Sequence, residues 1–165
     1  MIYYARSSNA AGEKESLKYH LNRVSELCAD FLVPLGNKDL GHALGTFHDF
    51  GKYSIIFQEV LTGIRFHVNH ALPGSALAFN AYQKMQSTAV LLATVIAAHH
   101  DKLDFNCISD IKQILTTEGK KYDTDGKTIS LPDIESIQNA SAVFRSELAL
   151  PRISSPLVYK DSLAK

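Results

Sequence analysis

Cysteine is scarce in this chain, and its scarcity argues against two classes of protein. Among the 165 residues only Cys28 and Cys107 are cysteines, and they form no C-x-x-C pair. A disulfide framework and a zinc ribbon both need more cysteines at closer spacing, so neither is expected. The two thiols lie in stretches of helical periodicity and are expected to be reduced core residues of a cytoplasmic protein.

Long apolar runs and an N-terminal signal pattern are lacking as well. The longest apolar run, Ala89 to Ala98, is far too short to cross a bilayer. The first ten residues, MIYYARSSNA, do not have the basic and then apolar layout of a secretory signal. Both observations favour the cytoplasm as the compartment of this protein.

An excess of charge of either sign is also missing. The 17 lysines and arginines balance the 17 aspartates and glutamates, so the formal net charge is zero. Nothing in this balance would draw a polyanion to the protein from a distance. If the substrate is a nucleic acid, we expect a partner to deliver it. Several lysines are scattered over the second half of the chain and could form a basic rim that binds a nucleic-acid strand, or simply an ordinary solvated surface. They are Lys102, Lys112, Lys120, Lys121 and Lys127.

The hydrophobic periodicity predicts an all-α fold. Apolar residues recur at steps of three and four in several segments, and residues 88–100 are apolar on nearly every face, as expected for a helix inside a core. Helices are expected over 17–32, 40–48, 54–61, 74–85, 88–100, 109–117 and 134–148, a loop over 63–73, and a loop or small hairpin over 118–130. The length is that of one domain, 1–165, so we expect a single helical bundle with at most one short β-hairpin.

Histidine, by contrast, is plentiful and patterned. Five of the seven histidines belong to one pattern, which comprises His20, His48 followed directly by Asp49, His70, and the pair His99-His100. Imidazoles combined with a carboxylate are a typical ligand set of transition metals. Any one of these histidines alone would more often be structural. Their combination therefore predicts a metal site.

Because His99 and His100 are adjacent, they can bind the same metal ion only if the helix ends near them. On an ideal helix the two side chains diverge by about 100°. Both can face one centre only if the helix ends there, which the segment Asp101-Lys102-Leu103-Asp104 makes plausible. The alternative is one core histidine and one solvated histidine. Of the remaining two, His42 is expected to be structural, and the role of His67 stays open.

Five motifs follow one another in order along most of the chain. They are Tyr4-Ala5-Arg6-Ser7, His20-Leu21-x-x-Val24, His48-Asp49-Phe50-Gly51-Lys52 with Phe57-Gln58, Asn69-His70 with Pro73-Gly74-Ser75-Ala76, and Ala97-Ala98-His99-His100. Together they resemble the HD superfamily of metal-dependent phosphohydrolases. More closely, they are similar to the HD nuclease domain of the CRISPR-associated helicase-nuclease of type I systems, including its stand-alone version. The motifs are specific jointly and not separately.

The resemblance implies two metal positions that share Asp49. One would be held by His20, His48, Asp49 and Asp161, and the other by Asp49, His70, His99 and His100. A carboxylate has two oxygens and can bridge ions about 3.5–4 Å apart, whereas an imidazole cannot. Asp161 matches the family's Leu-Val-x-x-Asp form, with a solvated tail aspartate as the alternative.

The expected catalytic residues are Asp49 and Lys52. Lys52 lies one turn past Asp49, where it would balance charge on the transition state, unless it is an ordinary surface lysine. Two positions depart from the family pattern. Asn69 stands where the family usually has an aspartate, which predicts weaker orientation of His70. Asp101-Lys102 replaces glycines, which predicts a narrower substrate entrance.

The resemblance implies a metal-dependent endonuclease or exonuclease that hydrolyses single-stranded DNA in CRISPR antiviral defence. The implied partners are a CRISPR-associated helicase and an RNA-guided surveillance complex. One or two divalent ions are expected, and imidazole-rich ligands favour Mn, Fe, Co, Ni or Zn over Mg. Two alternatives stay open, namely an HD phosphohydrolase acting on a nucleotide or cyclic nucleotide, and a degenerate, non-catalytic HD scaffold.

Overall fold

The computed structural model describes residues 1–65, 67–100, 122–123, 128–129 and 134–154. In these residues the elements are α1 (Leu17–Leu32), η1 (Val33–Leu35), α2 (Lys38–Phe47), η2 (Phe50–Tyr53), α3 (Ile55–Leu61), α4 (Ala71–Ala81), α5 (Gln86–Ala97), β1 (Tyr122–Asp123), β2 (Thr128–Ile129) and α7 (Ile134–Glu147). The two short strands form an antiparallel hairpin. The prediction of an all-α bundle with at most one short hairpin is confirmed. The helix expected over 109–117 lies outside the described residues.

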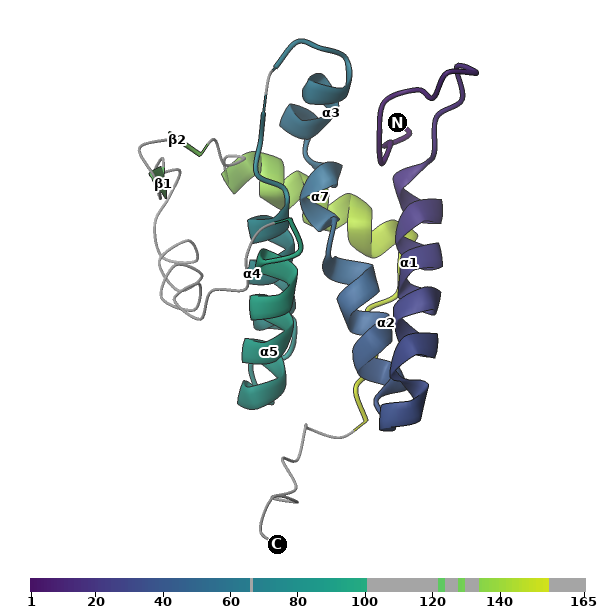
Figure 1. Cartoon of the computed structure of the whole chain (residues 1–165). Coiled ribbons are helices and arrows are strands. Elements are labelled where there is room, and N and C mark those ends of the chain that lie inside the picture. The colour runs from purple at the N-terminus through teal and green to yellow at the C-terminus, as the bar shows by residue number, and fades with distance from the viewer. Residues whose placement is uncertain (66, 101–121, 124–127, 130–133, 155–165) are drawn as a thin grey trace, which may run out of the picture.

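Helices α1 and α2 form one tightly packed pair (Figure 1). Ser16 begins α1 by accepting a hydrogen bond from the backbone N–H of Tyr19. The two backbones touch at Gly45, where an added Cβ would lie 2.4 Å from the Cα of Ser25. A side chain at Gly45 would therefore force the helices apart, and with them the two histidines that they carry, His20 and His48.

Helices α4 and α5 form the second pair (Figure 1), joined by a hydrogen bond from the hydroxyl of Ser75 to the carbonyl of Ala93 at 2.7 Å. The expected loop over 63–73 was too long, because α4 already begins at Ala71. Pro73 is tolerated in the first turn, where a backbone N–H has no acceptor within the helix. Helix α5 ends at Ala97 and not at His100, which matters for the site.

Helix α7 holds the centre of the fold through one aromatic side chain. The Phe144 ring packs against the rings of Phe47, Phe50 and Tyr53, with centroids 5.7, 5.3 and 5.9 Å apart. The hydroxyl of Tyr53 also donates to the carboxylate of Glu147 at 2.7 Å. Because Phe47 and Phe50 flank His48 and Asp49 in sequence, this cluster fixes the turn that carries the His-Asp pair.

The N-terminal segment is bound to the rest of the fold by Gln58. The side-chain amide of Gln58 accepts from the backbone N–H of Tyr4 at 3.1 Å, and it donates to the carbonyls of Tyr4 and Lys52 at 3.0 and 2.8 Å. Ala5 is held further by a backbone hydrogen bond to the carbonyl of Glu15 at 3.0 Å. The segment before α1 therefore has a defined place beside η2. Across the described ranges, every helix is too short or too polar to cross a membrane.

Candidate metal centre

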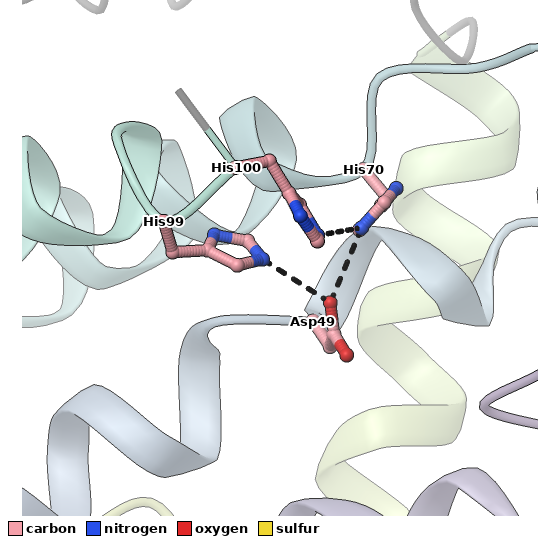
Figure 2. A group of neighbouring side chains, drawn as sticks. All are labelled: Asp49, His70, His99 and His100. Carbon is pink, nitrogen blue, oxygen red and sulfur yellow. Dashed lines mark hydrogen bonds and ion pairs between the residues drawn. The ribbon is translucent and has the colours of Figure 1, made fainter. Parts of the chain in front are cut away.

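Six of the seven predicted ligand residues come together at one point of the fold. They arrive from separate elements: His20 from α1, His48 and Asp49 from the junction of α2 and η2, His70 from the start of α4, and His99 and His100 from the turn after α5. Figure 2 shows four of them, with His70, His99 and His100 gathered around the carboxylate of Asp49. The seventh, Asp161, lies outside the described residues.

Asp49 is buried, with 3% of its surface exposed, and its two oxygens face different histidines. Oδ2 lies 3.1 Å from Nε2 of His20 and 3.1 Å from Nε2 of His48. Oδ1 lies 3.3 Å from Nε2 of His70 and 3.4 Å from Nε2 of His99 (Figure 2). The carboxylate therefore stands between two clusters of imidazoles.

These clusters divide the ligands into two groups, each with its donor atoms within 4.8 Å of one another. The first group is His20, His48 and Asp49, and the second is Asp49, His70, His99 and His100. We call them the His20 group and the His99 group. The division is the same as the one expected from the resemblance, apart from Asp161. Within the described residues, both groups can hold a metal ion.

The end of α5 lets His99 and His100 face the same centre. After Ala97 the helix tightens into a turn, in which the backbone N–H of His99 donates to the carbonyl of Ile96. The two rings lie 4.0 Å apart, and Nε2 of His100 is 2.8 Å from Nε2 of His70 (Figure 2). His100 is exposed and His99 is partly buried, and both contribute a ligand atom to the same group.

Hydrogen bonds behind the cluster orient two of the rings. Nδ1 of His48 donates to the carbonyl of Gly45 at 2.7 Å, and Nδ1 of His99 donates to the carbonyl of Ile96 at 2.6 Å. Since a carbonyl can only accept, Nδ1 of each ring carries a proton, and Nε2 is the nitrogen that faces the cluster. This is the usual arrangement behind a metal-binding imidazole.

Glu15 plays the corresponding part behind His20, and sequence reasoning missed it. Its carboxylate oxygen lies 3.5 Å from Nδ1 of His20 and 3.4 Å from Nε of Arg6. An acid five residues before a histidine, in a segment that precedes the helix, gives no periodic signal. Only the folded N-terminal segment brings Glu15 to the back of the His20 ring.

Several buried atoms in the cluster lack hydrogen-bond partners in the described structure. They are Oδ1 of Asp49, Nε2 of His99 and Nδ1 of His70. Two of these, Oδ1 of Asp49 and Nε2 of His99, face each other at 3.4 Å. Buried polar groups normally have partners. A cation between the two atoms, either a proton or a metal ion, would give both of them a partner, so the donor atoms fit a metal ion.

The protonation of the cluster also suits metal binding. Burial by itself would raise the pKa of the Asp49 carboxyl, but hydrogen bonding by the surrounding imidazoles, led by His20 and His48, outweighs burial and holds that pKa well below its usual range. Burial, together with the neighbouring His99 and His70, lowers the pKa of His100 to about 4. At neutral pH the cluster therefore offers an anionic carboxylate and a neutral His100.

Lys52 lies against Asp49 itself. Its ammonium Nζ is 2.8 Å from Oδ2 of Asp49 and donates to the carbonyl of Ala5 at 3.1 Å. Only 13% of the side chain is exposed, so the alternative of an ordinary surface lysine is wrong. Phe57 packs beside it, with its ring 5.5 Å from Nζ and 4.9 Å from the ring of His70.

Asn69 contributes to the start of α4. Its side-chain oxygen accepts from the backbone N–H of Leu72 at 3.0 Å. Nδ1 of His70 has no hydrogen-bond partner in the described structure, and the weaker orientation of His70 stays a prediction. The two remaining histidines lie outside both groups: Nδ1 of His42 is 3.1 Å from the hydroxyl of Ser25, and His67 is exposed. Asp101 and Lys102 are outside the described residues.

Comparison with known proteins adds no evidence on function, so the geometry of the cluster is the main evidence. No protein-family model matches the chain, and no curated protein matches it. What the structure establishes is a buried carboxylate shared by two imidazole groups, each of which can hold a metal ion.

Proposed function

We propose that this protein is a metal-dependent phosphodiesterase of the HD type, and specifically a nuclease that cleaves single-stranded DNA. The observation that supports this proposal best is the orientation of the Asp49 carboxylate. Its Oδ2 faces the histidines of the His20 group, and its Oδ1 faces those of the His99 group. A carboxylate that bridges two ions is typical of enzymes that hydrolyse phosphate esters.

The residues of the cluster are ligands and not nucleophiles. His20 and His48 present Nε2 on one side of Asp49, and His70, His99 and His100 do so on the other. Bound divalent ions would supply an activated water and would polarise the phosphate. Asp49 offsets the positive charge, while Lys52 adds a fixed positive charge close to where the phosphate would lie. Mn, Fe, Co, Ni and Zn suit these nitrogen-rich groups better than Mg.

The choice of single-stranded DNA and of partners is supported by the sequence resemblance. In this proposal the protein acts in CRISPR defence, together with a helicase and an RNA-guided surveillance complex. The zero net charge supports dependence on such partners, because few DNA phosphates can be neutralised by a protein without excess positive charge.

The test is a cleavage assay on circular single-stranded DNA with Mn, Co, Ni, Zn and Mg ions supplied in turn. A circle reports endonuclease action, and a linear strand of the same sequence reports exonuclease action as well. We expect cleavage that requires metal and stops with chelator. Cleavage that persists in excess EDTA would contradict the proposal, as would metal-dependent turnover of nucleotides or cyclic nucleotides without any DNA cleavage. Absence of all hydrolysis in a metal-loaded protein would indicate a binding scaffold.

A further inference from the structure

Of the two oxygens of Asp49, one is paired with a lysine and the other, within the described residues, is not. Oδ2, which faces the His20 group, has the ammonium of Lys52 at 2.8 Å. Oδ1, which faces the His99 group, contacts no lysine or arginine in the described part of the chain and has no hydrogen-bond partner there. One side of the carboxylate is therefore partly neutralised, and the other side is not.

Lys52 is held in this position from several directions. Its ammonium also donates to the carbonyl of Ala5. That carbonyl is fixed because Ala5 bonds to the backbone of Glu15 and because Gln58 binds both the neighbouring Tyr4 and the carbonyl of Lys52 itself. The ammonium would lose a close ion pair if it left Asp49, so it stays on the His20 side of the carboxylate.

The His99 side, by contrast, has no lysine or arginine paired with Oδ1 of Asp49 among the described residues. Nε2 of His99 and Oδ1 of Asp49 are both buried and have no hydrogen-bond partner in the described residues, and they lie 3.4 Å apart. A metal ion bound between them would give partners to both atoms at once.

We propose that Lys52 makes the two metal positions unequal and sets the order in which they fill. The His99 group takes the first ion tightly. The His20 group takes a second ion weakly, because that ion must approach an oxygen that already carries an ammonium. This inference rests on the metal-binding part of the proposed function, and it adds that the protein holds one ion when metal is scarce.

The test measures binding of Mn²⁺ alone to the full chain, by titration calorimetry and by equilibrium dialysis with metal analysis. For the wild type we expect two classes of site whose dissociation constants differ by about tenfold or more. Lys52→Met keeps the apolar stem but removes the charge, and should tighten the weak class by about tenfold while the tight class changes little. The matched control is Lys84→Met, because Lys84 is exposed and follows the end of α4 remote from His70.

Two further variants place the ions without relying on Lys52. We expect His99→Ala to abolish the tight class and His20→Ala to abolish only the weak class. Circular dichroism should first show that each variant keeps its helices. The inference is overturned if His20→Ala removes the tight class, or if folded Lys52→Met binds the second ion as weakly as the wild type does. A wild type that binds two equal ions overturns it and leaves the proposed function standing, whereas a wild type that binds no metal contradicts the proposed function itself.

Discussion

Gly51 lies directly against the backbone of His70. A Cβ placed on Gly51 would be 2.3 Å from the carbonyl oxygen of His70 and 2.7 Å from its Cα. The glycine next but one to Asp49 therefore allows the chain that carries His70 to reach the carboxylate. This contact joins two motifs that are about twenty residues apart in sequence. It explains why the His-Asp motif has a glycine at position 51, since any side chain there would collide with the backbone of His70.

We expect Gly51→Ala to move His70 away from Asp49 and so to weaken the His99 group. The neighbouring atoms are backbone, so they cannot rotate aside as a flexible side chain would. Metal titration should show the tight class weakened by about tenfold or more. The control is Gly63→Ala, because nothing lies within 4 Å of a Cβ at Gly63, so any strain there comes from its own φ of 77° and not from a contact with His70. Unchanged metal binding by folded Gly51→Ala would contradict the expectation.

Replacing Asp49 with asparagine should have the largest effect on function. Asparagine keeps the size, but it removes the negative charge and leaves one oxygen where two are needed. Metal analysis should find both positions empty or weakly filled, and DNA cleavage should fall by roughly three orders of magnitude or more. His42→Ala should keep its metal, since His42 contacts Ser25 and belongs to neither group. Near-normal metal content and cleavage in folded Asp49→Asn would refute the proposed site.

Bound metal should stabilise the fold, because both groups connect elements that are far apart in sequence. An ion at about 100 times its dissociation constant adds about 2.7 kcal/mol to the free energy of unfolding. For a domain of this size that corresponds to a rise of roughly 5–10 °C in Tm. Thermal melts with and without Mn²⁺ would measure it. The rise should vanish in Asp49→Asn, and a Tm that ignores metal in the wild type would count against binding.

Glu15→Gln tests the carboxylate behind His20. The amide keeps the shape but removes the negative charge beside Nδ1 of His20, so the His20 ring should be less well oriented. We expect the weak metal class to lose about tenfold in affinity, with the tight class unchanged. Glu13→Gln is the matched control, because Glu13 is exposed in the same segment and its hydrogen bonds in the described part of the chain are all to Asn9. Equal effects of the two substitutions would show that Glu15 has no special part.

Phe144→Ala tests the aromatic cluster under the His-Asp turn. The ring is fully buried against Phe47, Phe50 and Tyr53, so its removal should leave a cavity and cost about 3–5 kcal/mol in the free energy of unfolding. Urea denaturation would measure this loss. The control is Phe31→Ala, because Phe31 is 77% exposed and its loss should change stability by only about 0.5 kcal/mol. A loss below about 1 kcal/mol for Phe144→Ala would mean that the cluster is not structural.

The helices and the ligand residues could largely be read from the order of amino acids. Apolar periodicity depends on local geometry, so it placed α1, α2, α3 and α7 within two residues of their observed bounds. The boundaries of α4 and α5 were less accurate, because Pro73 looks like a helix breaker and because the apolar run continues up to His99. The histidine pattern predicted a metal site, and the family resemblance implied that its ligands divide into two groups around Asp49.

Other features of the site depend on contacts between segments that are distant in sequence, and only the tertiary structure reveals them. That His99 and His100 both face Asp49 follows from the turn after Ala97 and from packing against α4. The pairing of Lys52 with Oδ2, the support of His20 by Glu15 and the binding of Tyr4 by Gln58 all join elements across the fold. Such contacts leave no periodic trace in a sequence, because they are set by the three-dimensional packing of helices and not by the spacing of residues along any one of them.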